Sequence, residues 1–184
     1  MAKVKLCLIA FLMLIMSLLS FETLAYYTVT GTARNVITFG ELPAEVVETT
    51  ASGTEFPQEG VYVMPGDIVS KIVTVSNKSE HPFYVRVKLV KGVDNIELSP
   101  EECLSITTDT VNWTLAEDGY YYYNKAVPAY GATEPLFREV EVVGDKITTD
   151  QIGTILTVTV KVFVVQSENN ADTPFEAVGW PTES

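Results

Sequence analysis

The chain has 184 residues, a formal net charge of −12, one histidine and two cysteines. This acidity argues against nucleic acid or an anionic membrane surface as a partner, because both attract clustered lysine and arginine. The length is that of one ordinary domain, and no second domain is needed.

The first 25 residues have the composition of a secretory signal peptide. Lys3 and Lys5 precede an uncharged run over residues 6–21, and Thr23 and Ala25 place small side chains where a signal peptidase cleaves. As a helix, the run would span only about 24 Å at about 1.5 Å per residue, which is shorter than a hydrocarbon core of about 30 Å. We therefore expect residues 1–25 to be cleaved off and the protein to be secreted, with no stable membrane span afterwards. A retained single-span anchor is the alternative.

The mature chain predicted by this cleavage covers residues 26–184, begins at Tyr26 and forms a single domain. Cys7 leaves with the signal, so Cys103 remains without an intramolecular disulfide partner. The domain must then be held together by its core alone. We expect Cys103 to be buried and inert, the alternative being a crosslink between chains.

Apolar and polar side chains alternate with a period of two along the mature chain, which predicts β-strands. In residues 84–89, apolar positions alternate with Arg86 and Lys88, as a strand with one core face and one wet face requires. The longest run covers residues 155–165, and at about 3.3 Å per residue it predicts a central strand of about 35 Å. Further strands are expected at residues 71–77, 111–115, 120–125 and 138–143.

Turn residues separate these runs. Asp118 and Gly119 predict a type I′ hairpin that pairs residues 113–115 with four consecutive tyrosines. Residues 45–59 and the C-terminal segment 167–184 are polar, and we expect a mobile loop and a flexible tail. Short strands between turns spaced by roughly 8 to 12 residues predict an all-β, two-sheet antiparallel sandwich of jelly-roll or immunoglobulin type.

The four tyrosines of the predicted hairpin occupy both faces of their strand. If the outer rings are exposed, they form a candidate exposed aromatic strand for a ligand. Ordinary cross-strand packing with both faces covered is the alternative. The residues concerned are Tyr120, Tyr121, Tyr122 and Tyr123.

Side chains suited to catalysis or metal binding are scarce. His81 is the one histidine and lies in a Ser-Glu-His-Pro turn, where an exposed position is expected. Glu139 and Glu141 alternate on a predicted strand and share a face, where solvation is the ordinary fate of carboxylates. We predict no catalytic residue, no metal site and no cofactor, and hence no enzyme. A zinc site formed by His81 and two carboxylates is the alternative.

The order of segments resembles the TasA/camelysin family of exported β proteins. The resemblance covers essentially the full length and is carried by Ala25-Tyr26-Tyr27-Thr28, Ile37-Thr38-Phe39-Gly40-Glu41-Leu42, Pro65-Gly66-Asp67, Val73-Thr74-Val75-Ser76-Asn77, Tyr84-Val85-Arg86-Val87, Asp118-Gly119 with the four tyrosines, Pro135-Leu136-Phe137, and the stretch from Val165-Gln166 to Trp180.

This resemblance implies a jelly-roll-like sandwich that is processed by a SipW-type signal peptidase. It also implies secretion to the extracellular surface or biofilm matrix of a Gram-positive bacterium, where relatives assemble into fibres. The partners expected are therefore further copies of the chain, as a homo-oligomer or fibre, and the peptidase during export.

In such fibres the segment freed by cleavage adds as a strand to the next subunit. Carried onto this chain, that segment is residues 26–37, and the candidate donor strand consists of Tyr26, Tyr27, Thr28, Val29 and Thr30. Polar and apolar residues alternate there, and Gly31 supplies a flexible joint. Folding back into its own sheet is the alternative for this strand. Two further hypotheses are a camelysin-like cell-surface metalloendopeptidase and a monomeric adhesion module.

Overall fold

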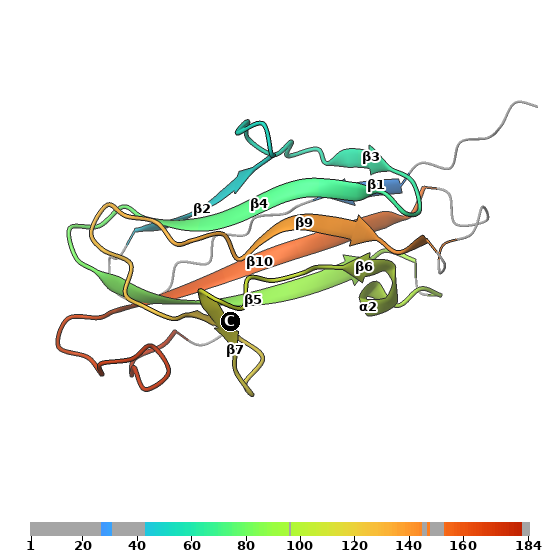
Figure 1. Ribbon diagram of the computed structural model, residues 1–184. Helices are drawn as coiled ribbons and strands as arrows, with labels where there is room; N and C mark the ends of the chain where they lie inside the picture. The colour runs from blue at the N-terminus through green and yellow to red at the C-terminus, as the bar shows by residue number, and fades with distance from the viewer. Residues whose placement is uncertain (1–26, 31–42, 96, 145–146, 148–152, 182–184) are drawn as a thin grey trace, which may run out of the picture.

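The structure is a computed structural model that describes residues 27–30, 43–95, 97–144, 147 and 153–181 (Figure 1). The predicted cleavage residues Thr23, Ala25 and Tyr26 lie outside the described residues, as does the 31–37 part of the candidate donor segment. Within the described part, no helix has the length and apolar character needed to cross a membrane.

Two β-sheets face each other across a valine-rich core, which confirms the predicted all-β two-sheet sandwich (Figure 1). One sheet has six strands in the order β3-β1-β10-β5-β8-β7, and the other has four in the order β2-β4-β9-β6. The strands of the first sheet are β1 (Tyr27–Thr30), β3 (Val61–Val63), β5 (Phe83–Val93), β7 (Trp113–Leu115), β8 (Tyr121–Tyr123) and β10 (Ile155–Gln166). Those of the second are β2 (Ala44–Thr49), β4 (Ile68–Asn77), β6 (Leu104–Ser105) and β9 (Phe137–Val142), with the short helix α2 (Pro100–Cys103) before β6.

The central strand predicted at residues 155–165 is confirmed as β10. It lies between β1 and β5 and pairs with β5 from Leu156↔Val93 to Gln166↔Phe83. Its alternate apolar side chains are almost fully buried, because the second sheet covers that face.

Cys103 is also fully buried, as predicted, and burial raises the pKa of its thiol, with a smaller contribution from the charge of Glu102.

The prediction of a mobile loop over residues 45–59 is wrong for residues 45–49. Residues 44–49 form β2, which pairs with β4 along the edge of the four-stranded sheet. Charged Glu48 broke the apolar alternation of Ala44 and Val46, but in the structure Glu48 is buried beside Lys71 of β4. The turn after β2 is covered by Phe56, which is 1% exposed.

The predicted pairing of residues 113–115 with the tyrosines is confirmed, with Trp113 opposite Tyr123 in the β7–β8 hairpin. The predicted type I′ turn is wrong. Among the residues of this loop only Gly119 has a positive φ, of 80°. The Gly119 N–H donates to the Ala116 carbonyl and the Ala116 N–H to the Tyr120 carbonyl, which makes a three-residue loop with glycine in the left-handed position.

Candidate functional site

The candidate donor strand lies within its own sheet, between β10 and β3. The β1 backbone runs parallel to β10, with Thr28 opposite Ile155 and Thr30 opposite Thr157. On its other side it runs antiparallel to β3, with Thr28 opposite Tyr62. We call the space between the main-chain edges of β10 and β3 the β1 slot.

β1 is the link that holds β3 in the six-stranded sheet. β3 stands at the end of the strand order and, within the described residues, no other strand pairs with it. Removing β1 would leave unpaired backbone on β3 and on the start of β10, where Leu156 is fully buried. Unpaired edges of this kind readily accept a strand from another chain. The β1 slot therefore has hydrogen-bonding backbone on both sides for a segment with the register of residues 27–30.

A second feature lies on the outer face of the same sheet, where aromatic rings surround the Arg86 guanidinium. The carbon of the guanidinium is 4.1 Å from the ring centroid of Tyr120 and 4.8 Å from that of Trp180, with Phe163 and Tyr122 at 5.6 and 6.0 Å. We call these five residues the Arg86 cluster. Its rings come from the β7–β8 hairpin, from β10 and from the C-terminal segment, so the cluster joins these three parts of the chain to β5.

Hydrogen bonds fix the guanidinium among these rings. Nη1 of Arg86 donates to the Tyr122 hydroxyl at 3.1 Å, and Nη2 donates to the Pro181 carbonyl at 3.2 Å. The Tyr122 hydroxyl in turn donates to Asp118 at 2.7 Å. Burial raises the pKa of Tyr122, opposed by the hydrogen bond from Arg86 and reinforced by Asp118, so this phenol stays protonated at neutral pH.

The Arg86 cluster corrects two predictions. Arg86 was expected on a wet face, yet its side chain is only 13% exposed because the C-terminal segment covers it. The structure also does not contain the predicted exposed aromatic strand. Tyr122 and Tyr123 are 5% and 2% exposed, and Tyr120 and Tyr121 are half-buried. Both faces of the strand are covered, since Tyr121 and Tyr123 pack toward the core.

The C-terminal segment 167–181 follows β10 and lies against the outside of the sheet (Figure 1). The Tyr84 hydroxyl donates to the Ala171 carbonyl at 2.9 Å, and the Phe175 ring lies 5.2 Å from that of Tyr122. The sequence predicted a flexible tail there. The signal that was missed is the pair of large aromatic residues, Phe175 and Trp180, in an otherwise polar stretch.

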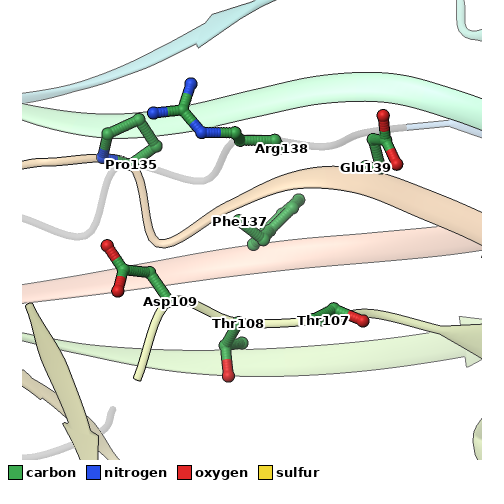
Figure 2. Close-up of a pocket in the computed structure, with 7 residues that line it drawn as sticks. All are labelled: Thr107, Thr108, Asp109, Pro135, Phe137, Arg138 and Glu139. Carbon is green, nitrogen blue, oxygen red and sulfur yellow. The ribbon is translucent and has the colours of Figure 1, made fainter. Parts of the chain in front are cut away.

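A shallow depression of about 400 Å³ lies between β9 and the segment after β6. Figure 2 shows Phe137 between the side chains of residues 138–139 and those of residues 107–109. Asp109 is the acidic residue of this depression whose carboxylate is held by hydrogen bonds within its own turn. The side chain of Asn112 and the backbone N–H groups that follow Asp109 donate to its carboxylate and lower its pKa. An ionised carboxylate held in its own turn is unsuited to act as a general acid.

His81 is exposed in its turn, as predicted. Its side chain is 59% exposed, and Nδ1 lies 3.2 Å from a carboxylate oxygen of Glu168. Among the residues that the structure describes, no three histidine, cysteine, aspartate or glutamate side chains are grouped so that they could hold a metal ion.

Comparison of the chain with protein-family models, curated proteins and solved structures finds no match. The resemblance to the TasA/camelysin family therefore stays a prediction.

Proposed function

We propose that this chain is a structural protein of the extracellular surface or biofilm matrix, not an enzyme, and that it assembles into fibres. In this proposal the segment freed by signal cleavage leaves its own β1 slot and enters the slot of the next copy. The predicted signal peptide and the resemblance to the TasA/camelysin family support secretion and matrix assembly, with a SipW-type peptidase as the processing partner.

The observation that carries the proposal is the place of β1 between β10 and β3. Exchange of an identical segment between copies recreates the same backbone hydrogen bonds, so its free energy is nearly balanced and assembly responds to concentration. β1 is four residues long and pairs in parallel with β10, a pairing slightly less stable per residue than an antiparallel one. Both properties favour exchange over permanent pairing.

A disulfide lock tests the exchange directly. Thr28 of β1 lies directly opposite Tyr62 of β3, and opposed residues of an antiparallel pair have the Cα separation that a disulfide requires. The variant T28C/Y62C, prepared from Tyr26 onward, is expected to stay monomeric when oxidised as a monomer and to form fibres after reduction. Electron microscopy and size-exclusion chromatography measure the two states, and fibres from the oxidised monomer would contradict the proposal.

Single substitutions in β1 supply a matched pair. Val29→Pro removes a backbone N–H that a paired strand needs, whereas Val29→Thr keeps a β-branched residue with full hydrogen-bonding capacity. We expect V29P to abolish fibres and V29T to retain them. A protein that begins at Gly31 should likewise remain a folded monomer, and undiminished fibres from it would exclude strand donation.

A further inference from the structure

Lys71 and Glu48 form a buried pair inside the sandwich. Nζ of Lys71 lies 2.5 Å from Oε2 of Glu48, and their side chains are 0% and 4% exposed. Glu48 belongs to β2 and Lys71 to β4, which are hydrogen-bonded neighbours. Lys71 lies within the register shift between Ser70 and Val73 in the pairing of β4 with β9. The two side chains therefore meet at a position set by the sheet rather than by two mobile surface chains.

The surroundings of this pair are apolar and incompletely hydrogen-bonded. The ring of Phe56 has its centroid 4.2 Å from Nζ of Lys71 and is 1% exposed. The backbone N–H of Phe56 donates to the carbonyl of Glu48, which fixes the ring over the pair. Oε1 of Glu48 has no hydrogen-bond partner among the described residues. Two full charges in such a site are costly, because neither is satisfied as water would satisfy it.

Burial also favours the neutral form of the Lys71 amine. Desolvation lowers the pKa of Lys71, and the hydrogen bond and charge of Glu48 only partly oppose that shift. Transfer of one proton from Nζ to the adjacent carboxylate oxygen gives a neutral amine beside a neutral carboxylic acid. A neutral amine has the free electron pair that a nucleophile needs.

We propose that Lys71 and Glu48 condense to an amide that crosslinks β2 to β4. The electron pair of Nζ attacks Cδ of the protonated carboxyl group and forms the C–N bond. One C–O bond of the carboxyl group breaks, and the leaving hydroxyl takes a proton from the nitrogen and departs as water. No atom is oxidised or reduced, and no co-reactant is consumed.

Two physical effects drive this step. The sheet holds nucleophile and electrophile in contact, which raises their effective concentration far above that of free groups. The dry site also disfavours the reverse reaction, because hydrolysis needs a water molecule beside the amide. The product replaces two buried charges with one neutral amide. It would also anchor β2, the edge strand of its sheet, to β4 without a disulfide.

The chain contains a matched pair of the same residue types that should not react. Lys78, which follows β4, lies 3.1 Å from Glu45 of β2, and both side chains are 53% exposed. Water reaches both side chains there, so neither charge pays the desolvation cost that the buried pair pays. The reaction is thus expected at the buried pair and not at the exposed one.

Cleavage at methionine gives a decisive test. Met64 is the one methionine within residues 26–184 and lies between Glu48 and Lys71 in the sequence. Cyanogen bromide should therefore cut the mature chain into fragments 26–64 and 65–184. If the amide has formed, the fragments stay joined and run as one band on a denaturing gel. The intact mass of the undigested protein should also be lower than that of the sequence by one water molecule.

The control variants are Lys71→Arg, which keeps the cation but removes the amine, and Lys78→Arg, which leaves the buried pair intact. K71R should give two fragments and the full mass, whereas K78R should behave as the wild type. Two fragments and the full sequence mass from the wild-type protein overturn the proposal, whatever the variants do. The test does not depend on fibre formation.

Discussion

Arg86 is predicted to be the residue that holds the C-terminal segment on the sheet. Replacing Arg86 with alanine removes the cation from between the rings of Tyr120 and Trp180 and the hydrogen bond to the Pro181 carbonyl. The segment 167–181 then keeps fewer contacts with the sheet, among them the hydrogen bond from Tyr84 to Ala171. We expect the segment to detach locally more often and the domain to lose stability.

The magnitude follows from the contacts. Two ring contacts closer than 5 Å contribute about 0.5–2 kcal/mol each, and a hydrogen bond from a charged donor about 1.5–3 kcal/mol. The ion pair with Asp118 adds little, because its atoms are 3.7 Å apart and Asp118 is 43% exposed. Water partly replaces the lost contacts, so R86A is expected to lower the free energy of unfolding by about 2–4 kcal/mol.

Urea denaturation measures this change as a lower midpoint at an unchanged slope. Hydrogen exchange followed by mass spectrometry should show faster exchange in peptides from residues 167–181 than the global loss of stability explains. Lys88→Ala is the matched control, since Lys88 shares the strand and face of Arg86 but lies 5.4 Å from the Tyr120 ring, and we expect a loss below about 1 kcal/mol. The reasoning is refuted if R86A unfolds at the wild-type urea concentration and segment 167–181 keeps its protection.

Three further predictions concern other parts of the fold. Because burial raises the pKa of Cys103, iodoacetamide should label this thiol only after denaturation, even at mildly alkaline pH; rapid labelling of native protein would contradict its burial. Hydrogen bonds lower the pKa of Asp109, so its contribution to stability is present above the ordinary aspartate pKa and is lost as the pH falls through the lowered value. In thermal melts, the melting temperature of Asp109→Ala should therefore be lower than that of the wild type at pH 7, and the difference should shrink in acid. A difference that stays the same at both pH values would show that the charge of Asp109 does not contribute to stability. A Cβ added at Gly92 would clash with Oγ1 of Thr157, so G92A should lower the free energy of unfolding by about 1–3 kcal/mol. Adding T157A to G92A should recover most of that loss. If the two effects are additive in a double-mutant cycle, the clash is excluded.

Strand periodicity was the part of the fold that could be predicted from the sequence. Residues 155–165 and 84–89 have an apolar side chain at every second position, and they form parts of β10 and β5, the longest pair of the six-stranded sheet. β2 was missed because its core-facing pattern contains Glu48, whose burial depends on a lysine 23 residues away. The hairpin partners were also predictable, but its turn type was not, since a type I′ turn and a three-residue loop both accept Asp118-Gly119.

The candidate sites were predicted less completely than the strands. The alternation in residues 26–30 marked a strand, but not whether that strand pairs within its own chain or with another. The tyrosine run marked an aromatic strand, but the structure buries it beneath segment 167–181. The side chain of Arg86 reaches a carbonyl 95 positions along the chain, and no local pattern contains that contact.

The sequence by itself determined which segments form strands and which of their faces are apolar, because side-chain direction alternates with every residue of an extended backbone. Only the tertiary structure decided where Lys71, Glu48 and Arg86 lie, because a charged side chain is buried only when distant parts of the chain bring it a partner. The same holds for β1, whose neighbours β3 (Val61–Val63) and β10 (Ile155–Gln166) are far apart in the sequence.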